Sequence, residues 1–312
     1  MVGKKVAVVG SGATAVTLVP ELAKMGAGHV TIVQRSKTYI VDQWRKDWFV
    51  RLLLALWVPK AVAAQLGRWR QIWLQVGWYR FCTTFPNAAR AVIAAITRSH
   101  LGSDKELLSH FEPAYDPWTQ RLCMCPDGDF FEAIANGSAN VVTGAAAGFS
   151  ATGLRLITGV DVEADVVVTA TGMNLQQNMP MGRIAVAVDG EPYVARDHAV
   201  YKSVMLSGVP NFAFSYGYVN ISWTLRSDLA ATYVCRLLNY MEEREYDQVV
   251  ATPGPEFQEA ASKSPLSSSY VLRSLDKLPK EGAKAPWKTS QNYFDDRAVL
   301  THGPLDDEVV FS

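Results

Sequence analysis

The sequence predicts an α/β fold built on a parallel β-sheet, and three observations support this prediction. Residues 4–9 form a short, mostly apolar run that ends at Gly10, which is typical of a buried parallel strand. Residues 13–25 have the length of a helix, although Pro20 is expected to kink it or shift its start. Residues 29–34 form a second β run. Strand, helix and strand within about 30 residues make a βαβ unit.

Composition sets the limits on the remaining possibilities. A chain of 312 residues predicts about two domains of ~150 residues each. Lys+Arg and Asp+Glu are both 30, so the charge balance does not indicate a nucleic-acid partner. The longest apolar region, residues 48–66, is interrupted by Arg51, Pro59 and Lys60. A membrane-spanning helix needs ~20 apolar residues, so no integral membrane segment is predicted.

Cysteine usage indicates a reducing compartment, and we expect a cytoplasmic protein. The chain has four cysteines, too few for a disulfide framework at this length: Cys82, Cys123, Cys125 and Cys235. Cys123 and Cys125 form a C-x-C pair with no second cluster nearby, so we expect buried thiols and no metal site.

Residues 42–112 are expected to form a helical insertion after the second strand, since apolar residues recur there at helical spacing. Core or interdomain packing is the simplest interpretation of its six tryptophans, and a substrate-channel wall or a partner surface are the alternatives. These tryptophans are Trp44, Trp48, Trp57, Trp69, Trp73 and Trp78.

The rest of the chain alternates shorter elements. Residues 113–135 suggest a proline-rich loop followed by a short helix, and residues 139–170 suggest three short strands. Residues 224–243 are the clearest helix. The tail from Tyr270 carries few regular signals.

The strongest functional motif lies between the first strand and the first helix and fits G-x-G-x-x-G/A. Its residues are Gly10, Ser11, Gly12, Ala13, Thr14 and Ala15. The first glycine permits a tight turn, the second lets the backbone approach a pyrophosphate, and the small third residue allows close helix–strand packing. The helix N-terminus then presents free N–H groups to the phosphates. We expect a dinucleotide site, the alternative being a tight turn without a ligand.

The end of the second strand predicts which dinucleotide binds. NAD sites usually place an acid there for the ribose hydroxyls, whereas this chain has Gln34, Arg35 and Ser36. A guanidinium matches a 2′-phosphate in charge and geometry, which favours NADP(H) over NAD. The alternative is a solvated surface arginine. A second small-residue motif ends a later strand, at Thr171 and Gly172.

These features resemble the flavin-dependent Baeyer–Villiger monooxygenases, in particular the ethionamide-activating group. The resemblance covers essentially the whole chain. It rests on the segments VAVVGSGATAVTLVPELA, VTIVQRSKTYI, YDPWTQRLCMCPDGDFFEAI, VVVTATGMNLQ, SGVPNFAFSYGYVNISWTLRSDLAATYVCRLLNYM and YVLRSLDKLPK.

The resemblance implies two cofactors, FAD in one Rossmann-like domain and NADP(H) in another that is inserted into it. It implies O2 as co-substrate and a small molecule, a ketone or a sulfide or thioamide, as the oxygen acceptor; a nitrogen centre is a further acceptor class. Arg35 and Ser36 would face the 2′-phosphate. Arg121 would match the active-site arginine beside the flavin and the nicotinamide, where a fixed cation stabilises developing negative charge. The alternative for Arg121 is a salt-bridged loop residue.

The resemblance also assigns the second half of the chain. Residues 1–165 would form the NADP-binding domain, and residues 166–312 the C-terminal part of a discontinuous FAD and substrate domain. Thr171 and Gly172 would mark the return into that domain. Asn220, with Tyr218 and Trp223, would lie near the flavin or the substrate, with core packing as the alternative.

The chain departs from the family pattern in its glycine motifs. Family members carry two fingerprints of this kind, and only residues 10–15 fit one here. We therefore expect a chain that lacks the N-terminal FAD-binding segment. Three functions follow: a monooxygenase completed by that segment, a non-catalytic NADP-binding remnant or half of a split enzyme, and a one-cofactor dehydrogenase. The last is disfavoured because no suitable Tyr-x-x-x-Lys pair occurs.

Overall fold

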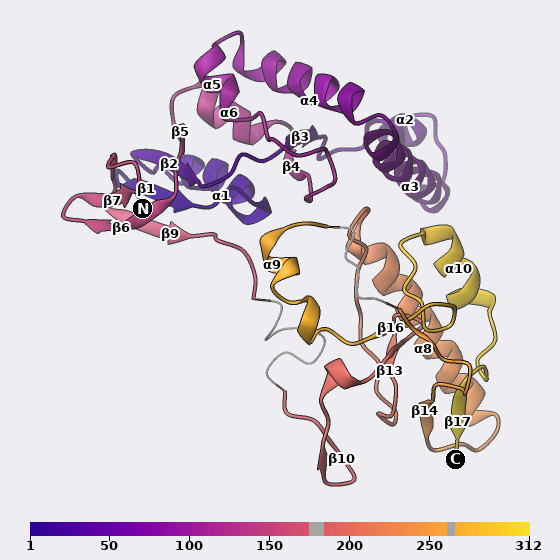
Figure 1. Cartoon of the computed structure of the whole chain (residues 1–312). Coiled ribbons are helices and arrows are strands. Elements are labelled where there is room, and N and C mark those ends of the chain that lie inside the picture. Colours follow the sequence, from indigo (N-terminus) through magenta and orange to yellow (C-terminus); the bar gives the residue numbers. More distant parts are fainter. Residues whose placement is uncertain (175–183, 261–265) are drawn as a thin grey trace. The chain divides into compact units, whose positions relative to one another are not determined.

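The computed structural model describes residues 1–174, 184–260 and 266–312, and the chain divides into two compact units (Figure 1). Unit 1 comprises Met1–Met173 and unit 2 comprises Asn174–Ser312. The sequence placed the boundary between residues 165 and 166. Each unit has its own internal packing and is described by itself.

A four-stranded parallel sheet forms the centre of unit 1, with strand order β5-β2-β1-β9. The two middle strands, β1 and β2, are rich in β-branched residues and are largely buried, as expected of a parallel sheet covered on both faces. The predicted βαβ unit is therefore confirmed. The strands are β1 (Lys5–Val9), β2 (His29–Gln34), β5 (Ala139–Thr143) and β9 (Val166–Thr169).

Two different layers cover this sheet. On one face, α1 (Ala13–Lys24) and α6 (Asp129–Ala135) contribute buried apolar residues to one core cluster with the strands. On the other face, Ala7 and Val33 pack against a three-stranded antiparallel sheet, which the sequence predicted only in part. Helix α1 begins at Ala13, so the predicted shift of its start by Pro20 is wrong. The additional sheet comprises β6 (Ala146–Ser150), β7 (Gly153–Leu156) and β8 (Asp161–Glu163).

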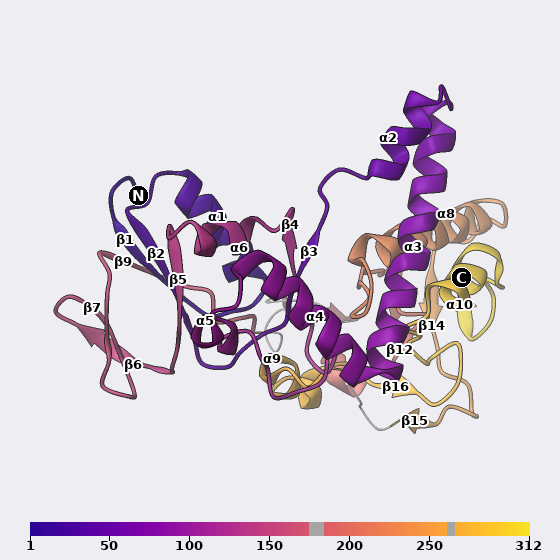
Figure 2. The same ribbon diagram turned by 90° about the horizontal axis from the view of Figure 1, so that it is seen from above.

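The predicted helical insertion lies between β3 (Ile40–Gln43) and β4 (Cys123–Pro126), two short strands that pair in parallel (Figure 2). Helices α2 and α3 form an antiparallel hairpin. None of the six tryptophans of the insertion is fully buried. Trp78 is half-buried and packs against a core cluster of unit 1, as expected. The expectation of core packing is wrong for the exposed tryptophans Trp44, Trp48, Trp57 and Trp73. The helices are α2 (Trp48–Ala55), α3 (Lys60–Thr84), α4 (Pro86–Leu101) and α5 (Lys105–Ser109).

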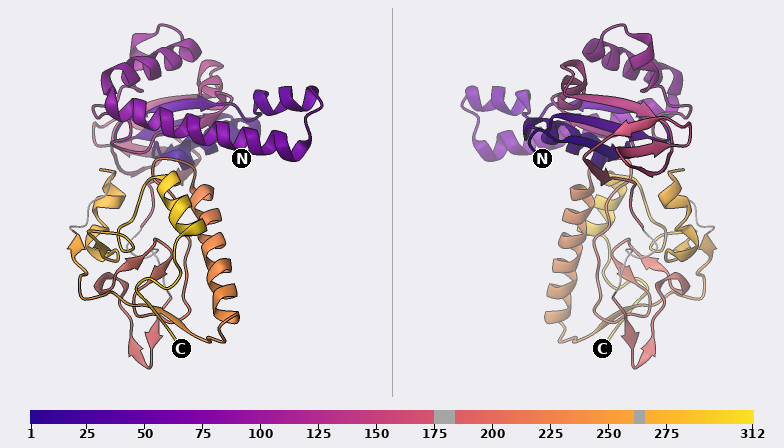
Figure 3. Two further views of the ribbon diagram at one scale, coloured as in Figure 1. Left: turned by 90° about the vertical axis from the view of Figure 1, so that its right-hand side faces the viewer. Right: turned by 90° about the vertical axis from the view of Figure 1, so that its left-hand side faces the viewer.

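Unit 2 is organised around two helices that pack together, α8 (Trp223–Glu242) and α10 (Tyr293–His302) (Figure 3). Helix α8 was predicted, whereas α10 was not, because its sequence has only a weak apolar stripe. Short antiparallel pairs surround the helices. The remaining elements are β10 (Ala187–Val188), β11 (Glu191–Pro192), η1 (Ala195–Asp197), β12 (Val200–Tyr201), β13 (Met205–Leu206), β14 (Val249–Ala251), β15 (Glu259–Ala260), α9 (Ser269–Leu272), η2 (Leu275–Lys277), β16 (Glu281–Gly282) and β17 (Val309–Phe311).

Within the described parts of the chain, no helix combines the length and the apolar character that crossing a membrane requires.

Candidate functional site

The two small-residue motifs of unit 1 meet at the carboxyl edge of the parallel sheet. Strand β9 runs beside β1, and the Ala170 N–H donates to the Val9 carbonyl over 2.8 Å. Gly10 has a φ of +124°, and a Cβ there would lie 2.2 Å from the Ala170 carbonyl oxygen. Only glycine fits this position. Thr171 and Gly172 therefore follow directly beside the turn after β1.

Gly12 leaves open space in front of helix α1. It is the N-cap residue with a φ of −79°, and a Cβ there would meet nothing within 4 Å. No side chain caps the helix, and its first turn carries no acid. The backbone N–H groups at the start of α1, where Ala13 and Thr14 are exposed, are thus available to an anion at the positive end of the helix dipole.

Ala15 fills the third position of the motif as the sequence predicted. Its side chain is fully buried and belongs to the core cluster between α1 and the sheet. A larger residue there would push the helix away from the strands, and with it the N–H groups that face the open space.

Ser11 connects the loop after β1 to the loop after β2. Its hydroxyl donates to the Ser36 carbonyl over 3.0 Å and lies 3.4 Å from the Thr38 hydroxyl. Arg35 is thereby held next to the glycine loop. Its side chain is exposed and forms no hydrogen bond or ion pair with any described residue.

Gln34 occupies the position where an NAD site usually places an acid, and its side chain is already engaged. It is buried, and its amide nitrogen donates to the His110 carbonyl over 2.8 Å and to the Thr143 hydroxyl over 3.0 Å. The His110 ring nitrogen Nδ1 lies 2.7 Å from the same hydroxyl. Burial lowers the pKa of His110, and the charge of Lys37 lowers it further. The Gln34 side chain is therefore used within the protein, which the sequence did not show. Arg35, the next residue, is the exposed side chain at this edge of the sheet.

The loop before β4 holds Arg121 on the approach to the glycine loop. Trp118 is buried edge-to-face on Tyr79 at 5.4 Å, and the Tyr39 hydroxyl donates to the Tyr115 carbonyl over 2.8 Å. Arg121 itself is exposed. These contacts fix the loop while leaving its arginine accessible.

Cys123, two residues beyond Arg121, connects that loop to the glycine loop. Its Sγ lies 3.7 Å from the Ser11 carbonyl oxygen. Burial raises the pKa of Cys123 to about 12, and the nearby charge of Arg121 opposes that rise. Cys123 and Cys125 are buried free thiols, as predicted. Arg121 is thus two residues away in sequence from a side chain that contacts the glycine loop.

Asn220 belongs to unit 2 and precedes helix α8. Its amide nitrogen donates to the Gln291 carbonyl over 2.9 Å, whereas its Oδ1 is buried and has no partner among the described residues. Trp223 opens the helix and is partly exposed. An unsatisfied buried acceptor marks Asn220 as a candidate contact for a ligand donor. Nothing places it relative to the glycine loop of unit 1.

A buried ion pair behind Asn220 was missed by the sequence analysis. Arg226 is fully buried, and its Nη2 and Nε donate to Asp296 Oδ2 over 2.8 and 3.2 Å. The Tyr218 hydroxyl donates to the same oxygen over 2.6 Å, and the guanidinium lies 4.1 Å from the centre of its ring. One signal was available: Arg226 shares the helical face of Leu229 and Tyr233, which are buried.

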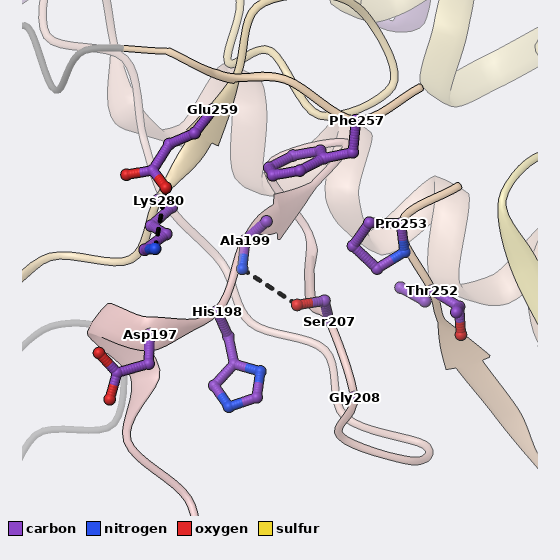
Figure 4. A pocket seen from close by; sticks show the side chains of 11 residues that line it. Asp197, His198, Ala199, Ser207, Gly208, Thr252, Pro253, Phe257, Glu259 and Lys280 are labelled. Carbon is purple, nitrogen blue, oxygen red and sulfur yellow. Dashed lines mark hydrogen bonds and ion pairs between the residues drawn. The ribbon is translucent and has the colours of Figure 1, made fainter. Parts of the chain in front are cut away.

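Unit 2 also contains a concavity of about 330 Å³ (Figure 4). Several of its polar groups are engaged with one another: Lys280 and Glu259 form an ion pair at 2.8 Å, and the Ser207 hydroxyl accepts from the Ala199 N–H over 3.0 Å. None of the predicted site residues lines it. Among residues 1–174, 184–260 and 266–312, no group of His, Cys, Asp and Glu side chains could hold a metal ion.

Relatives of known classification share this sequence over almost its whole length. The FAD-containing monooxygenase EthA of Mycobacterium tuberculosis is 44% identical over 306 residues, which is 98% of this chain and 62% of the relative. A protein named "Probable FAD-binding monooxygenase AlmA" from an Acinetobacter species is 41% identical over 309 residues, 99% of this chain and 61% of the relative. The chain thus spans about three fifths of the length of these relatives. No family model matches it.

Solved structures of low sequence identity share the fold. An oxidised steroid monooxygenase bound to NADP has a TM-score of 0.69 at 17% identity, over 99% of this chain and 67% of that one. A polycyclic ketone monooxygenase from Thermothelomyces thermophila has a TM-score of 0.69 at 15% identity, over 100% of this chain and 60% of that one. The fold class predicted from the sequence is confirmed. At 44% and 41% identity over almost its whole length, the chain is thus similar to part of the FAD-containing monooxygenase EthA and of AlmA.

Proposed function

We propose that this chain is the NADPH-binding part of an FAD- and NADPH-dependent monooxygenase, which inserts one oxygen atom of O2 into a ketone or oxidises a sulfur or nitrogen centre. The observation that carries the proposal is the open helix N-terminus at Gly12, with Arg35 held beside it by the Ser11–Ser36 hydrogen bond. The similarity to FAD-containing monooxygenases supports the reaction class.

The residues of unit 1 fit NADPH. A diphosphate would accept hydrogen bonds from the N–H groups that follow Gly12, where no Cβ blocks its approach. The Arg35 guanidinium and Ser36 would bind the 2′-phosphate. NADPH supplies a hydride when bound. The chain's own part is to bind the phosphates, to orient the nicotinamide toward Arg121, and to hold the carboxyl ends of β1 and β9 together at Gly10.

The fit to FAD is partial, so no reaction step is derived through it. Thr171 and Gly172 beside the first loop, and the unsatisfied Oδ1 of Asn220, are groups that the chain would contribute. A second phosphate loop would come from a further segment, as in one half of a split monooxygenase. A non-catalytic NADP-binding remnant is the alternative. Free buried thiols, including Cys82, support a cytoplasmic location.

Replacement of Gly12 by alanine tests the NADPH site without disturbing the backbone. The φ of −79° suits an L-residue and the space is empty, so the fold is retained, whereas the methyl group occupies the place of the phosphate. We expect NADPH affinity, measured by calorimetric titration of the purified chain, to fall at least about tenfold. Gly77→Ala, at another glycine with open space, is the matched control and should bind like the wild type. Equal affinity in the two variants would overturn the proposed site.

The flavin content of the purified chain tests whether FAD binding needs a further segment besides this chain. With a single phosphate loop, the chain alone should purify without stoichiometric FAD, as read from absorbance in the visible range. A yellow preparation with one FAD per chain would contradict the need for a second segment.

A further inference from the structure

Helices α2 and α3 of unit 1 are joined by a turn (Figure 2). Large apolar side chains are exposed at and around this turn. Trp57, at the turn itself, is 93% exposed, and Leu56 is 65% exposed. Trp57 also has a φ of +60°, a backbone conformation that is rare for a bulky residue. We call residues 52–62 the hairpin tip. Its exposed large apolar side chains are those of Leu52, Leu54, Leu56, Trp57 and Val62.

Hydrogen bonds and close packing hold helices α2 and α3 together at the end of the hairpin opposite the tip. Asp47 caps helix α2 and accepts hydrogen bonds from Arg70 over 3.1 Å and from Gln71 over 3.0 Å, both on α3. Gly67 lets the two helices approach closely, since a Cβ there would lie 2.3 Å from a methyl group of Val50. These contacts fix the two helices relative to each other, and no described element of unit 1 covers the tip.

The charge around the tip is of one sign. Residues 48–103 contain seven Lys and Arg and no Asp or Glu, although the whole chain has a formal net charge of zero. Lys60 in the tip, on α3, and Arg51 directly before it, on α2, are exposed and form no ion pair with any described residue. The exposed apolar side chains of the tip are therefore accompanied by two exposed cations, Arg51 and Lys60, which we call the charged collar.

We propose that the hairpin tip binds the surface of an anionic lipid bilayer. Tryptophan favours the headgroup boundary, and leucines beside it are removed from water when they enter the acyl region. Lys and Arg next to such a segment are attracted by anionic headgroups. A second copy of the chain fits less well, because it would bring Arg51 and Lys60 against the same charges. The helices lie on the bilayer and do not cross it.

Vesicle flotation with the full 312-residue chain tests the proposal. The probes are vesicles of phosphatidylcholine alone and of phosphatidylcholine with about a third phosphatidylglycerol. We expect the chain to float with the anionic vesicles, and the double variant Leu56→Ser/Trp57→Ser to lose at least about tenfold in bound fraction. Phe149→Ser removes an apolar side chain of comparable exposure on β6 and should float like the wild type.

The charged collar is tested separately. Arg51→Glu/Lys60→Glu should abolish the preference for anionic over neutral vesicles, whereas Lys4→Glu, elsewhere in unit 1, should leave it unchanged. The tip and collar variants should keep wild-type circular dichroism and NADPH affinity, since residues 51–62 are remote in sequence from the glycine loop. This keeps the outcome independent of the proposed NADPH site.

Three results would overturn the proposal. One is the absence of flotation with either kind of vesicle. Another is an equal loss in Phe149→Ser and in the tip variant. The third is a wild-type dimer, seen by light scattering, that becomes monomeric in Leu56→Ser/Trp57→Ser, because the tip would then be an interface between copies.

Discussion

The two units use their arginines in opposite ways. In unit 1, Arg35 and Arg121 are exposed, without ion pairs among the described residues, near a loop whose backbone donors are open. In unit 2, Arg226 is fully buried and bound to Asp296. An exposed cation is free to bind an anionic ligand, whereas a buried, paired one could do so only by breaking its pair. The first kind therefore points to function and the second to stability.

The largest expected effect comes from breaking the buried pair. Asp296→Ala leaves the Arg226 guanidinium buried without its carboxylate and also removes the acceptor of the Tyr218 hydroxyl. The free energy of unfolding should fall by about 3–5 kcal/mol, as measured by urea denaturation. Asp295→Ala is the matched control, because this neighbouring carboxylate is exposed and accepts a hydrogen bond from Asn292.

The difference in stability between the two variants shows whether the Arg226–Asp296 ion pair stabilises unit 2. Asp295→Ala should lose no more than about 1 kcal/mol. Arg226→Met/Asp296→Leu, which removes both charges, should recover part of the loss, since no buried charge is left unpaired. Equal stability of Asp296→Ala and Asp295→Ala would show that the ion pair does not hold α8 to α10.

Removal of Arg121 should affect oxygen transfer and not stability. In a flavoprotein assembled from this chain and a flavin-binding segment, Arg121→Ala should lower the rate of product formation about 10²-fold, as for loss of one fixed stabiliser of developing negative charge. Lys at this position should recover little, since it lacks the planar fork. Arg98→Ala, another exposed arginine, is the control. Wild-type oxygenation by Arg121→Ala would make Arg121 a structural loop residue.

Arg35 should set the choice between NADPH and NADH. Arg35→Ala should cost about 1–3 kcal/mol of NADPH affinity, the range of a charge-assisted contact, and leave NADH affinity nearly unchanged. Titration of both nucleotides into wild type, Arg35→Ala and Arg98→Ala measures this. A wild-type chain that binds the two nucleotides equally would contradict the predicted specificity.

The sequence predicted those features of the site that depend on residues close together in the chain. The turn at Gly10 was predictable, because the positive φ and the close approach of backbone act on that residue itself. The pairing of β1 with β9, which brings Thr171 beside Gly10, was not predicted, because the two strands are distant in sequence and residues 166–172 were assigned to the other domain. The engagement of Gln34 with His110 and Thr143 could not be predicted, because the partners are distant in sequence and meet only in the folded sheet.

Which polar and apolar side chains are buried was also predicted less well, because the residues that cover them are distant in sequence. The tryptophans of the insertion have core-like spacing, yet Trp57 is exposed because no described element of unit 1 covers the hairpin tip. Arg226 lies on a buried helical face because Asp296, 70 residues later, neutralises it. Periodicity identifies the faces of a helix, but a contact from elsewhere decides which face is covered.

The smallest expected effect is a pH dependence at the edge of the proposed NADPH site. Burial, and then the charge of Lys37, lower the pKa of His110 in the folded chain. The unfolded chain therefore binds more protons than the folded one below the ordinary histidine value of about 6.5. The resulting stability is fully present above that pH and is lost as the pH falls below it. The urea midpoint should thus decrease from pH 6.5 toward pH 5, and His110→Gln should flatten this slope.

His302→Gln supplies the control for that slope, because His302 is exposed on α10 in unit 2. The same pH titration also tests whether the exposed cations of unit 1 bind the 2′-phosphate. A 2′-phosphate bound beside Arg35 and Lys37 would offset the charge that lowers the pKa of His110. Saturating NADPH should therefore reduce the slope more than saturating NADH does. A slope that is unchanged in His110→Gln would show that this histidine does not report on the site, and equal effects of both nucleotides would place the 2′-phosphate elsewhere.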